Sequence, residues 1–487
     1  MTPTLALVPL DERPVCAALP AQIAAVAGAR TLLPPASALP RIRRPGDPDA
    51  IAAWLASTPC DAAVVALETL GFGGLIASRT VPVTVEEVTG RWASLRSLDV
   101  PVHAVTLVTR TPDSRDAMEE PDYWSAYGPA LHRLSARLHR ESDAEGSGVA
   151  ADIPPEVRQD FMLRRLRNHT LNLAALGLLS DGTLRSLVVG ADDTALWGLA
   201  TGELAWLRTW ATWLGDDRVA VRPGADEATA ALVARVIAGG DPVTFTIAAT
   251  GPLDRVAPYE NMPVERTARG QIAACGAVMD EAAPQVSLLI HVPDQSGADW
   301  AVAPPSGTDR AAAERLAALA ERLLRAGRRV AVADCAQPNG SDPALVEALA
   351  GRGLLHRLTA YAGWNTAGNA IGTAVAHAVA AVAGQRSGTF DAGAHRRLLL
   401  RRLVEDYGYM TKARGAARRR LGGDPLLHDH VPAGHPVIHD IAVALDALDL
   451  PGFGGLRVRR VRLPWERTFE VDFDIEEGGD ACVQPTS

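Results

Sequence analysis

Short apolar segments alternate with longer stretches of helical periodicity along most of this chain. The short segments are rich in Val, Leu and Ala, and the stretches between them repeat Ala, Leu and Arg at helical spacing. This alternation is typical of βα units that build a parallel sheet. The sequence predicts ten strands: residues 5–8, 31–33, 63–67, 104–108, 187–189, 219–221, 243–248, 286–291, 329–333 and 358–361.

Charged and amide side chains gather directly after these strands, whereas the segments before the strands contain fewer of them. Since the carboxyl ends of parallel strands carry the chemistry in α/β proteins, one face of the sheet is predicted to hold the functional site. The candidate residues are Asp11, Glu12, Arg13, Arg79, Arg110, Asp192, Asp193, Asp226, Asp294, Asn339, Trp364 and Asn365.

The predicted fold is a TIM-like α/β barrel with additions. Residues 1–383 form the core, residues at about 121–180 form a helical insertion, and residues 384–487 form a small carboxy-terminal cap. Within the cap, residues 458–461 and 469–474 alternate at period two and predict antiparallel strands. Ten strands exceed the eight of a barrel, so two doubly wound parallel-sheet lobes are the alternative.

Charge and composition exclude several classes of protein. The chain has 487 residues and a net charge of −9, which argues against a nucleic-acid binder. It has neither a basic leader before an apolar segment nor 18 uninterrupted apolar residues, so we expect a soluble cytoplasmic protein with no membrane partner. The five cysteines are scattered without a CxxC motif and predict no disulfide framework or zinc ribbon. A homo-oligomer is compatible with the sequence.

The adjacent carboxylates Asp192 and Asp193 are the predicted catalytic residues. They follow the apolar segment Ser186–Ala191, so both can face a pocket only where that strand is ending. Two close carboxylates push one pKa up and leave the other ionised, which supplies an acid and a stabilising charge. Alternatively, one of the two caps a helix that starts near Ala195.

The first strand is followed by Asp11, Glu12 and Arg13, which could bind a polar substrate. Arg13 could form a fork to a carboxylate or orient Asp192, and the alternative is an internal salt-bridge cluster. Arg79 and Arg110 follow the third and fourth predicted strands, where they could contact a polar ligand. No P-loop and no GxGxxG motif follows a strand, so nucleotide binding has little support.

Trp364 and Asn365 follow the last predicted strand. An indole offers a flat platform of the kind on which sugars stack, and an amide both donates and accepts hydrogen bonds. The alternative is a buried Trp beside a helix cap. Four histidines between His428 and His439 lie in a Pro- and Gly-containing segment without the spacing of a helical metal motif, so no metal and no cofactor is predicted.

Several of these blocks resemble a known bacterial family, the "domain of unknown function 4127". They are residues 9–14, 73–79, 109–112, 192–194, 223–227 and 361–369, and the resemblance covers nearly the whole chain. The family name implies no activity. A weaker likeness is to substrate-assisted N-acetylhexosaminidases on TIM barrels, which implies that Asp192 would hold a substrate acetamide and Asp193 would be the general acid/base.

We therefore expect a hydrolase of glycosidase type that acts on a small polar, carbohydrate-like substrate. Two other functions stay open from the sequence. One is a non-catalytic protein that binds a small polar ligand between two lobes, and the other is a metal-dependent hydrolase. The sharpest geometric test is whether Asp11, Arg110, Asp193 and Asn365 share one pocket.

Overall fold

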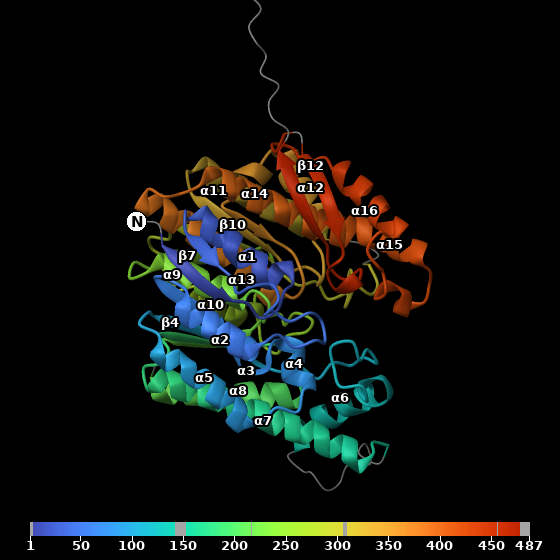
Figure 1. Ribbon diagram of the computed structural model, residues 1–487. Coiled ribbons are helices and arrows are strands. Elements are labelled where there is room, and N and C mark those ends of the chain that lie inside the picture. The colour runs from blue at the N-terminus through green and yellow to red at the C-terminus, as the bar shows by residue number, and fades with distance from the viewer. Residues whose placement is uncertain (1–2, 142–151, 216, 305–308, 455, 478–487) are drawn as a thin grey trace, which may run out of the picture.

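In the part of the chain that the structure describes, the strands form two parallel sheets and one antiparallel pair (Figure 1). The computed structural model describes residues 3–141, 152–215, 217–304, 309–454 and 456–477. The first sheet has the order β2-β1-β3-β4-β5-β6 and the second β11-β10-β9-β7-β8. The strands of the first sheet are β1 (Thr4–Val8), β2 (Arg30–Leu32), β3 (Ala62–Ala66), β4 (Val102–Val108), β5 (Ser186–Ala191) and β6 (Val219–Pro223). Those of the second are β7 (Thr244–Ala249), β8 (Val278–Met279), β9 (Val286–His291), β10 (Arg329–Asp334) and β11 (Ala360–Ala362).

Both sheets repeat one strand order. In each sheet the first strand lies between the second and the third, and later strands add on one side. This is the doubly wound 2-1-3-4-5 order, in which ligands bind outside the carboxyl ends of the strands. The protein is thus a mixed α/β protein with parallel sheets of six and five strands. Among the described residues, the strand pairing shows no single closed barrel, because β6 ends the first sheet and β7 starts the second.

Helices cover both faces of the first sheet. One face is covered by α1 and α9, and the other by elements that include α2, α5, α7 and α8. The helical insertion predicted between β4 and β5 is present as α6 and α7. The bounds are α1 (Pro14–Val26), α2 (Pro48–Ser57), α3 (Leu67–Phe72), α4 (Leu75–Thr80), α5 (Val85–Trp92), η1 (Ala93–Ser97), α6 (Trp124–Glu141), α7 (Pro155–Ser180), α8 (Leu199–Leu214) and α9 (Ala228–Ala238).

Three of the helices beside the second sheet start at side-chain caps. Asp309, Asp342 and Asp391 each accept a hydrogen bond from a first-turn amide of α11, α12 and α14. Such caps satisfy amides that have no partner inside the helix. The bounds are α10 (Val264–Ala274), α11 (Arg310–Arg325), α12 (Pro343–Gly351), η3 (Leu355–Arg357), α13 (Ala367–Ser387) and α14 (Ala392–Arg402).

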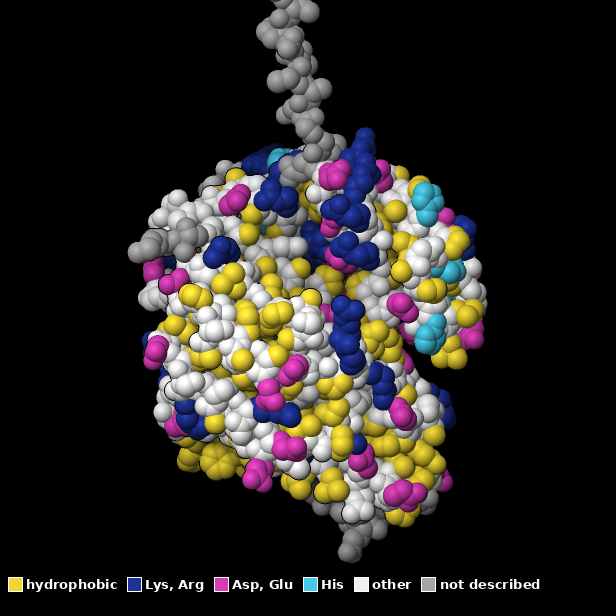
Figure 2. Space-filling model, in the orientation of Figure 1, with side chains coloured by type: hydrophobic (Ala, Val, Ile, Leu, Met, Phe, Trp, Pro, Cys, Tyr) yellow, Lys and Arg dark blue, Asp and Glu magenta, His cyan; other side chains and the backbone are white. Residues whose placement is uncertain are grey.

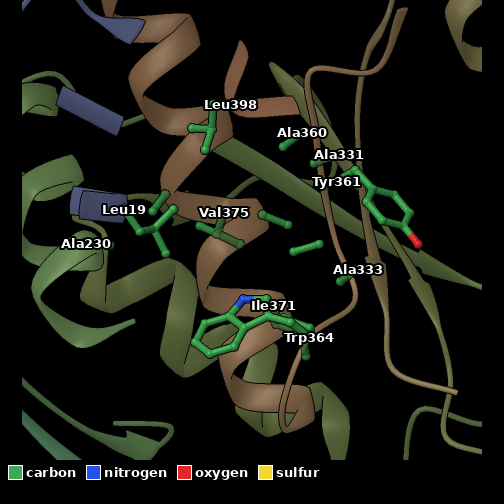
Figure 3. Close-up of a cluster of buried hydrophobic side chains, with 14 of the residues drawn as sticks. Leu19, Ala230, Ala331, Ala333, Ala360, Tyr361, Trp364, Ile371, Val375 and Leu398 are labelled. Atoms are coloured by element: carbon green, nitrogen blue, oxygen red, sulfur yellow. The ribbon is translucent and has the colours of Figure 1, made fainter. Parts of the chain in front are cut away.

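Helix α13 joins the two halves of the molecule. It packs against β10 and β11 of the second sheet and against α1 and α9 of the first. Figure 3 shows this junction, where Leu19 and Ala230 meet Ile371 and Val375. The Ala- and Gly-rich sequence of α13 permits the close approach. A Cβ added at Gly372 would lie 2.5 Å from Cγ of Glu227, the residue just before α9, so a larger residue there would crowd the contact between α13 and the first half.

By length and composition α13 is the one described helix that could cross a membrane, but its apolar window is entirely buried. A helix that is apolar on all sides is the expected core element of a large protein. Its burial fits the expectation of a folded protein without a membrane span, and the cytoplasmic location stays a prediction.

The part of the predicted carboxy-terminal cap that follows α14 lies at the upper right of Figure 1. Its two strands pair antiparallel, as the period-two pattern predicts. A segment of π-helix, η4, continues α14 and packs against α16 and β11. The bounds are η4 (Leu403–Ala413), α15 (Arg414–Leu421), η5 (Pro425–His428), α16 (Pro436–Asp446), β12 (Leu456–Arg462), η6 (Pro464–Glu466) and β13 (Asp472–Glu477).

Candidate functional site

A cavity of about 930 Å³ opens where the carboxyl ends of the two sheets face each other. It is lined by residues that follow strands of both sheets and by residues of the cap, and Figure 2 shows the surface hollowed at the right-hand edge, between the cap and α6. Its volume is that of a small-molecule site. Nine of the twelve predicted site residues line it: Arg13, Arg79, Arg110, Asp192, Asp193, Asp226, Asp294, Asn339 and Asn365.

The Asp192–Asp193 pair stands at the end of β5, on the first-sheet side of the cavity. Asp192 accepts a hydrogen bond from Arg79, and Asp193 Oδ2 lies 3.2 Å from Arg110 Nη1. Neither carboxylate caps the next helix, because α8 begins only at Leu199 with Gly198 at its cap position. The alternative capping role is therefore wrong for both, and both carboxylates are available to the cavity.

The two neighbours differ in their electrostatic surroundings. Burial raises the pKa of Asp193 to about 6, and the adjacent Asp192 carboxylate contributes to the same rise, while Arg110 opposes it. The Asp193 side chain keeps 32% of its surface exposed. Asp193 can therefore hold a proton near neutral pH and present it to a ligand, next to the Arg-paired carboxylate of Asp192.

Behind this pair, Arg79 and Arg110 share the buried carboxylates Glu119 and Glu120. Arg79 Nη1 lies 3.1 Å from Glu119 Oε2 and 3.2 Å from Glu120 Oε1, and Arg110 Nε lies 2.8 Å from Glu120 Oε1. Although burial opposes ionisation, Arg110 and three further arginines hold the pKa of Glu119 well below its usual range. The positive charge of these arginines is thus largely compensated within the protein.

Arg13 is the centre of a second ion-pair cluster. Its Nη2 lies 2.7 Å from Asp11 and 2.7 Å from Asp226, and Glu470 is 3.9 Å from its Nη1. The interpretation of Asp11 and Arg13 as an internal salt-bridge cluster agrees with this geometry. Asp11 is buried and does not line the cavity, so its expected place in the pocket is corrected: its carboxylate is held by the Arg13 fork.

The loop between β12 and β13 closes the cavity from the cap. The guanidinium groups of Arg13 and Arg467 both lie against the indole ring of Trp465, at 4.6 and 4.5 Å from the ring centroid. Arg467 also pairs with Glu119 at 2.6 Å, and the Trp465 indole donates to Glu12 at 2.7 Å. The expectation that Glu12 lines the cavity is therefore corrected, because its carboxylate binds Trp465 of the cap instead.

On the second-sheet side, Asp299 organises the polar lining. It accepts a hydrogen bond from the Tyr259 hydroxyl at 2.7 Å and from Asn339 Nδ2 at 3.0 Å. The Asn339 Oδ1 atom is buried and has no protein partner. Asn365 Nδ2 reaches back to Asp226 at 3.3 Å, so the two sheets share this hydrogen-bond network.

Three of the seven described residues other than Gly with positive φ line this cavity. Tyr259, Asn339 and Asn365 have φ values of 65°, 62° and 53°. Left-handed conformations of residues other than Gly cost free energy and persist where the surroundings enforce them, which is common at functional sites. Their grouping around one cavity favours a functional role for it.

Trp364 requires a further correction. It is 2% exposed, donates to Thr373 Oγ1 at 3.0 Å and packs in the core beside Ile371 (Figure 3). It does not line the cavity and cannot serve as the sugar platform that we expected. The positive φ of Asn365 turns the chain so that the amide faces the cavity while the preceding indole points into the core.

Sequence reasoning missed the residues that hold the predicted ones in place. They are Glu119, Glu120, Tyr259, Asp299, Trp465, Arg467 and Glu470. The adjacent acids Glu119 and Glu120 follow the strand-end residue Arg110 and could have been noticed. The loop residues 465–470 carry no local signal, since their contacts are with residues at the other end of the chain.

One group of described residues could hold a metal ion. Ligand atoms of Asp11, Cys16 and Asp226 lie within 4.8 Å of one another. Arg13 already donates to both carboxylates, and burial raises the pKa of the Cys16 thiol well above its usual value, so the thiolate form is disfavoured. These residues fit a guanidinium better than a cation. The histidines of residues 428–439 form no such group in the described part of the chain, and the histidine side chains on the cap lie apart in Figure 2.

The four described cysteines are free, and Cys482 lies outside the described residues. A family model described as "Protein of unknown function (DUF4127)" matches residues 5–474. No curated protein and no solved structure matches the chain. The likeness to TIM-barrel hexosaminidases finds no support in these comparisons.

Proposed function

Since the chain belongs to the DUF4127 family, whose name carries no activity, we propose a function from the site: a hydrolase of glycosidase type. Its substrate is a small, neutral, carbohydrate-like molecule bound in the cavity between the two sheets. The observation that carries the proposal is the pair at the end of β5, where Asp193 has a pKa raised to about 6 and Asp192 is bound by Arg79. The proposal requires a shared cavity at the strand ends and does not depend on a closed barrel.

In this proposal Asp193 is the general acid and base. Its protonated carboxyl gives a proton to the glycosidic oxygen as the bond from that oxygen to the anomeric carbon breaks. Asp192 stabilises the positive charge that develops on the sugar ring, or positions the acetamido group of an N-acetylated substrate. Water then adds to the anomeric carbon and returns its proton to the Asp193 carboxylate.

The charge of the lining favours a neutral substrate over an anionic one. Ten acidic residues face five arginines around the cavity, and Arg13, Arg79, Arg110 and Arg467 are already ion-paired. A phosphate or carboxylate would have to displace these carboxylates. A polyhydroxylated ligand can instead donate hydrogen bonds to the carboxylates that line the cavity.

The test is hydrolysis of a panel of nitrophenyl glycosides that includes N-acetylhexosaminides. Asp193→Asn keeps the shape of the side chain but removes the proton, and we expect it to lower kcat by about 10²-fold or more. The matched control is Asp99→Asn, an exposed residue before β4, at the opposite end of that strand from the cavity. Full activity in Asp193→Asn would exclude this assignment.

A second candidate is a non-catalytic binding protein of two doubly wound lobes. The repeated strand order favours it, because the cavity lies at the carboxyl ends of both sheets, where such lobes take ligands. In that case a sugar would raise the thermal unfolding midpoint without being turned over. Stabilisation by an intact sugar together with inactivity on the whole glycoside panel would favour binding over hydrolysis.

A further inference from the structure

Helix α8 presents an uncharged apolar face to solvent. Its inner residues Leu204 and Leu207 pack on the first sheet. Its outer residues Trp206, Trp210 and Trp213 are 64%, 52% and 85% exposed. They are spaced by four and three positions and therefore form one stripe along the helix. A stripe of three exposed tryptophans is far outside what a soluble surface usually carries.

The face also lacks the charges that would keep it solvated. The other exposed positions of α8 from residue 205 to its end are Ala205, Thr209, Thr212 and Leu214. Of the charged residues nearby, Glu203 is bound to Arg165 at 2.7 Å, and Asp217 lies beyond the end of the helix. Arg208 is half-buried and lies on the side of α8 opposite the stripe. A partner for this face must therefore be uncharged and apolar, because any charge set against it would be desolvated without compensation.

Helix α7 packs beside α8 along the lower edge of the molecule (Figure 1) and widens the apolar surface. Its exposed apolar residues are Met162, Leu163, Leu166 and Leu173. At about 150–250 Å² for a whole aromatic side chain, the three tryptophans alone offer roughly 300–500 Å². With Leu214 and the residues of α7, the surface approaches the ~800 Å² per partner of a stable interface.

We propose that this face of α7 and α8 binds the same face of a second copy of the chain, as a two-fold symmetric dimer. In a two-fold interface each patch meets itself, so an uncharged patch automatically finds an uncharged partner. A membrane surface is the less suitable occupant, since interfacial helices use flanking Lys and Arg and the chain has a net charge of −9.

The dimer leaves both catalytic cavities open. Ala200 and Thr201, at the start of α8, line the cavity. The helix then runs away from it toward the opposite end of the sheet, so the tryptophan stripe lies on the portion farther from the cavity. Substrate entry is therefore independent of this interface, and the inference stands whether or not the proposed hydrolase activity is found.

The experiment is light scattering after size-exclusion chromatography of the full chain over a range of about 0.5–50 μM, with analytical ultracentrifugation as a second measure. We expect a dimer for the unaltered protein and a monomer for the double variant Trp210→Glu and Trp213→Glu. Trp213→Phe, which keeps an aromatic contact, should remain dimeric. Val443→Glu places a charge at another exposed apolar position, on α16, and should also remain dimeric. Circular dichroism establishes that each variant is folded.

Each outcome decides the proposal. An unaltered protein that is monomeric at 50 μM overturns it, and so does a dimer that survives the double Trp substitution, since the interface would then lie elsewhere. Co-sedimentation with vesicles of phosphatidylcholine and phosphatidylglycerol tests the lipid occupant. Vesicle binding by a monomer, lost in the double variant, would assign the face to lipid and overturn the dimer.

Discussion

The indole of Trp465 lies 4.6 Å from the guanidinium of Arg13, although the two residues come from opposite ends of the chain. Arg13 holds Asp11 and Asp226 on its other side. The contact therefore connects the cap to the ion pairs beneath the cavity. Substitution of either residue tests how much the contact stabilises the protein.

Trp465→Ala should destabilise the protein by about 3 kcal/mol, because it leaves a cavity where a buried indole contacts two guanidinium groups. Trp465→Phe keeps the ring but loses the hydrogen bond to Glu12, and should cost only about 1 kcal/mol. Urea unfolding followed by circular dichroism measures both. Equal losses for the two variants would mean that the indole does not fill this space.

Arg13→Ala should be far more damaging than removal of an exposed arginine. It leaves the buried carboxylates Asp11 and Asp226 without their partner, at a cost of about 3–5 kcal/mol. The matched control is Arg96→Ala, which breaks an exposed pair with Asp181 and should cost less than about 1 kcal/mol. Similar unfolding free energies for the two variants would contradict the central role of Arg13.

Glycoside cleavage should decline as the pH rises through about 6. Burial raises the pKa of Asp193 to about 6, so the acid form that donates the proton is lost above that value. The measurement is kcat/KM against pH for the best glycoside of the panel, with the Asp99→Asn variant alongside. A rate that rises through the same interval would instead make the carboxylate form the active one.

The ionisation of Glu68 should lower the free energy of unfolding as the pH rises from about 5 to 7. Burial raises its pKa to about 7 in the folded state, so below pH 4.5 both states bind the proton and near neutrality only the folded state still does. The stabilising protonation is thus fully present at low pH and is lost as pH rises through the folded pKa. Ionising this buried carboxyl costs on the order of 1–3 kcal/mol.

Glu68→Gln provides the check on this pH dependence. The amide oxygen can still accept the hydrogen bond from the Leu107 amide, now 2.7 Å from Glu68 Oε1. We therefore expect unfolding free energies of the variant to vary less between pH 5 and 7 than those of the unaltered protein. An unchanged slope would place the titrating group elsewhere.

Chelation should leave both activity and stability unchanged. Asp11, Cys16 and Asp226 could surround an ion, but Arg13 already neutralises the two carboxylates. Elemental analysis of the purified protein and assays after EDTA dialysis measure this. Loss of activity on dialysis, restored by one divalent metal, would favour the metal-dependent hydrolase.

The positions of the strands could be predicted from the sequence because strand formation depends on local patterns. All ten predicted segments overlap observed strands, and residues 286–291 coincide with β9. Only β8, with two residues, escaped notice in the second sheet. The pairing of the strands could not be predicted, since it depends on where α9 carries the chain after β6. The two-sheet alternative agrees with the observed pairing, whereas the prediction of an eight-stranded barrel rests on the polar residues that follow the strands.

Site residues that directly follow strands could be predicted from the sequence. Residues whose direction depends on the local backbone conformation could not. Asp193 and Asp226 line the cavity as the strand-end rule predicts. Trp364 and Asn365 are neighbours in sequence, but the left-handed turn at Asn365 sends one to the core and the other to the cavity. Arg467 and Trp465 act through contacts with the first loop, and no local pattern announces such distant partners.

The closing loop of the cap also bears on how the protein is made in the cell. Residues 465–470 supply the indole that contacts Arg13 and Arg467, and the Glu470 carboxylate near Arg13. The cavity is therefore incomplete until these residues have left the ribosome. A nascent chain could form both parallel sheets and still lack a finished site. Any activity of this site should therefore begin only after Glu470 has emerged from the ribosome, which keeps partly synthesised chains from acting on substrate.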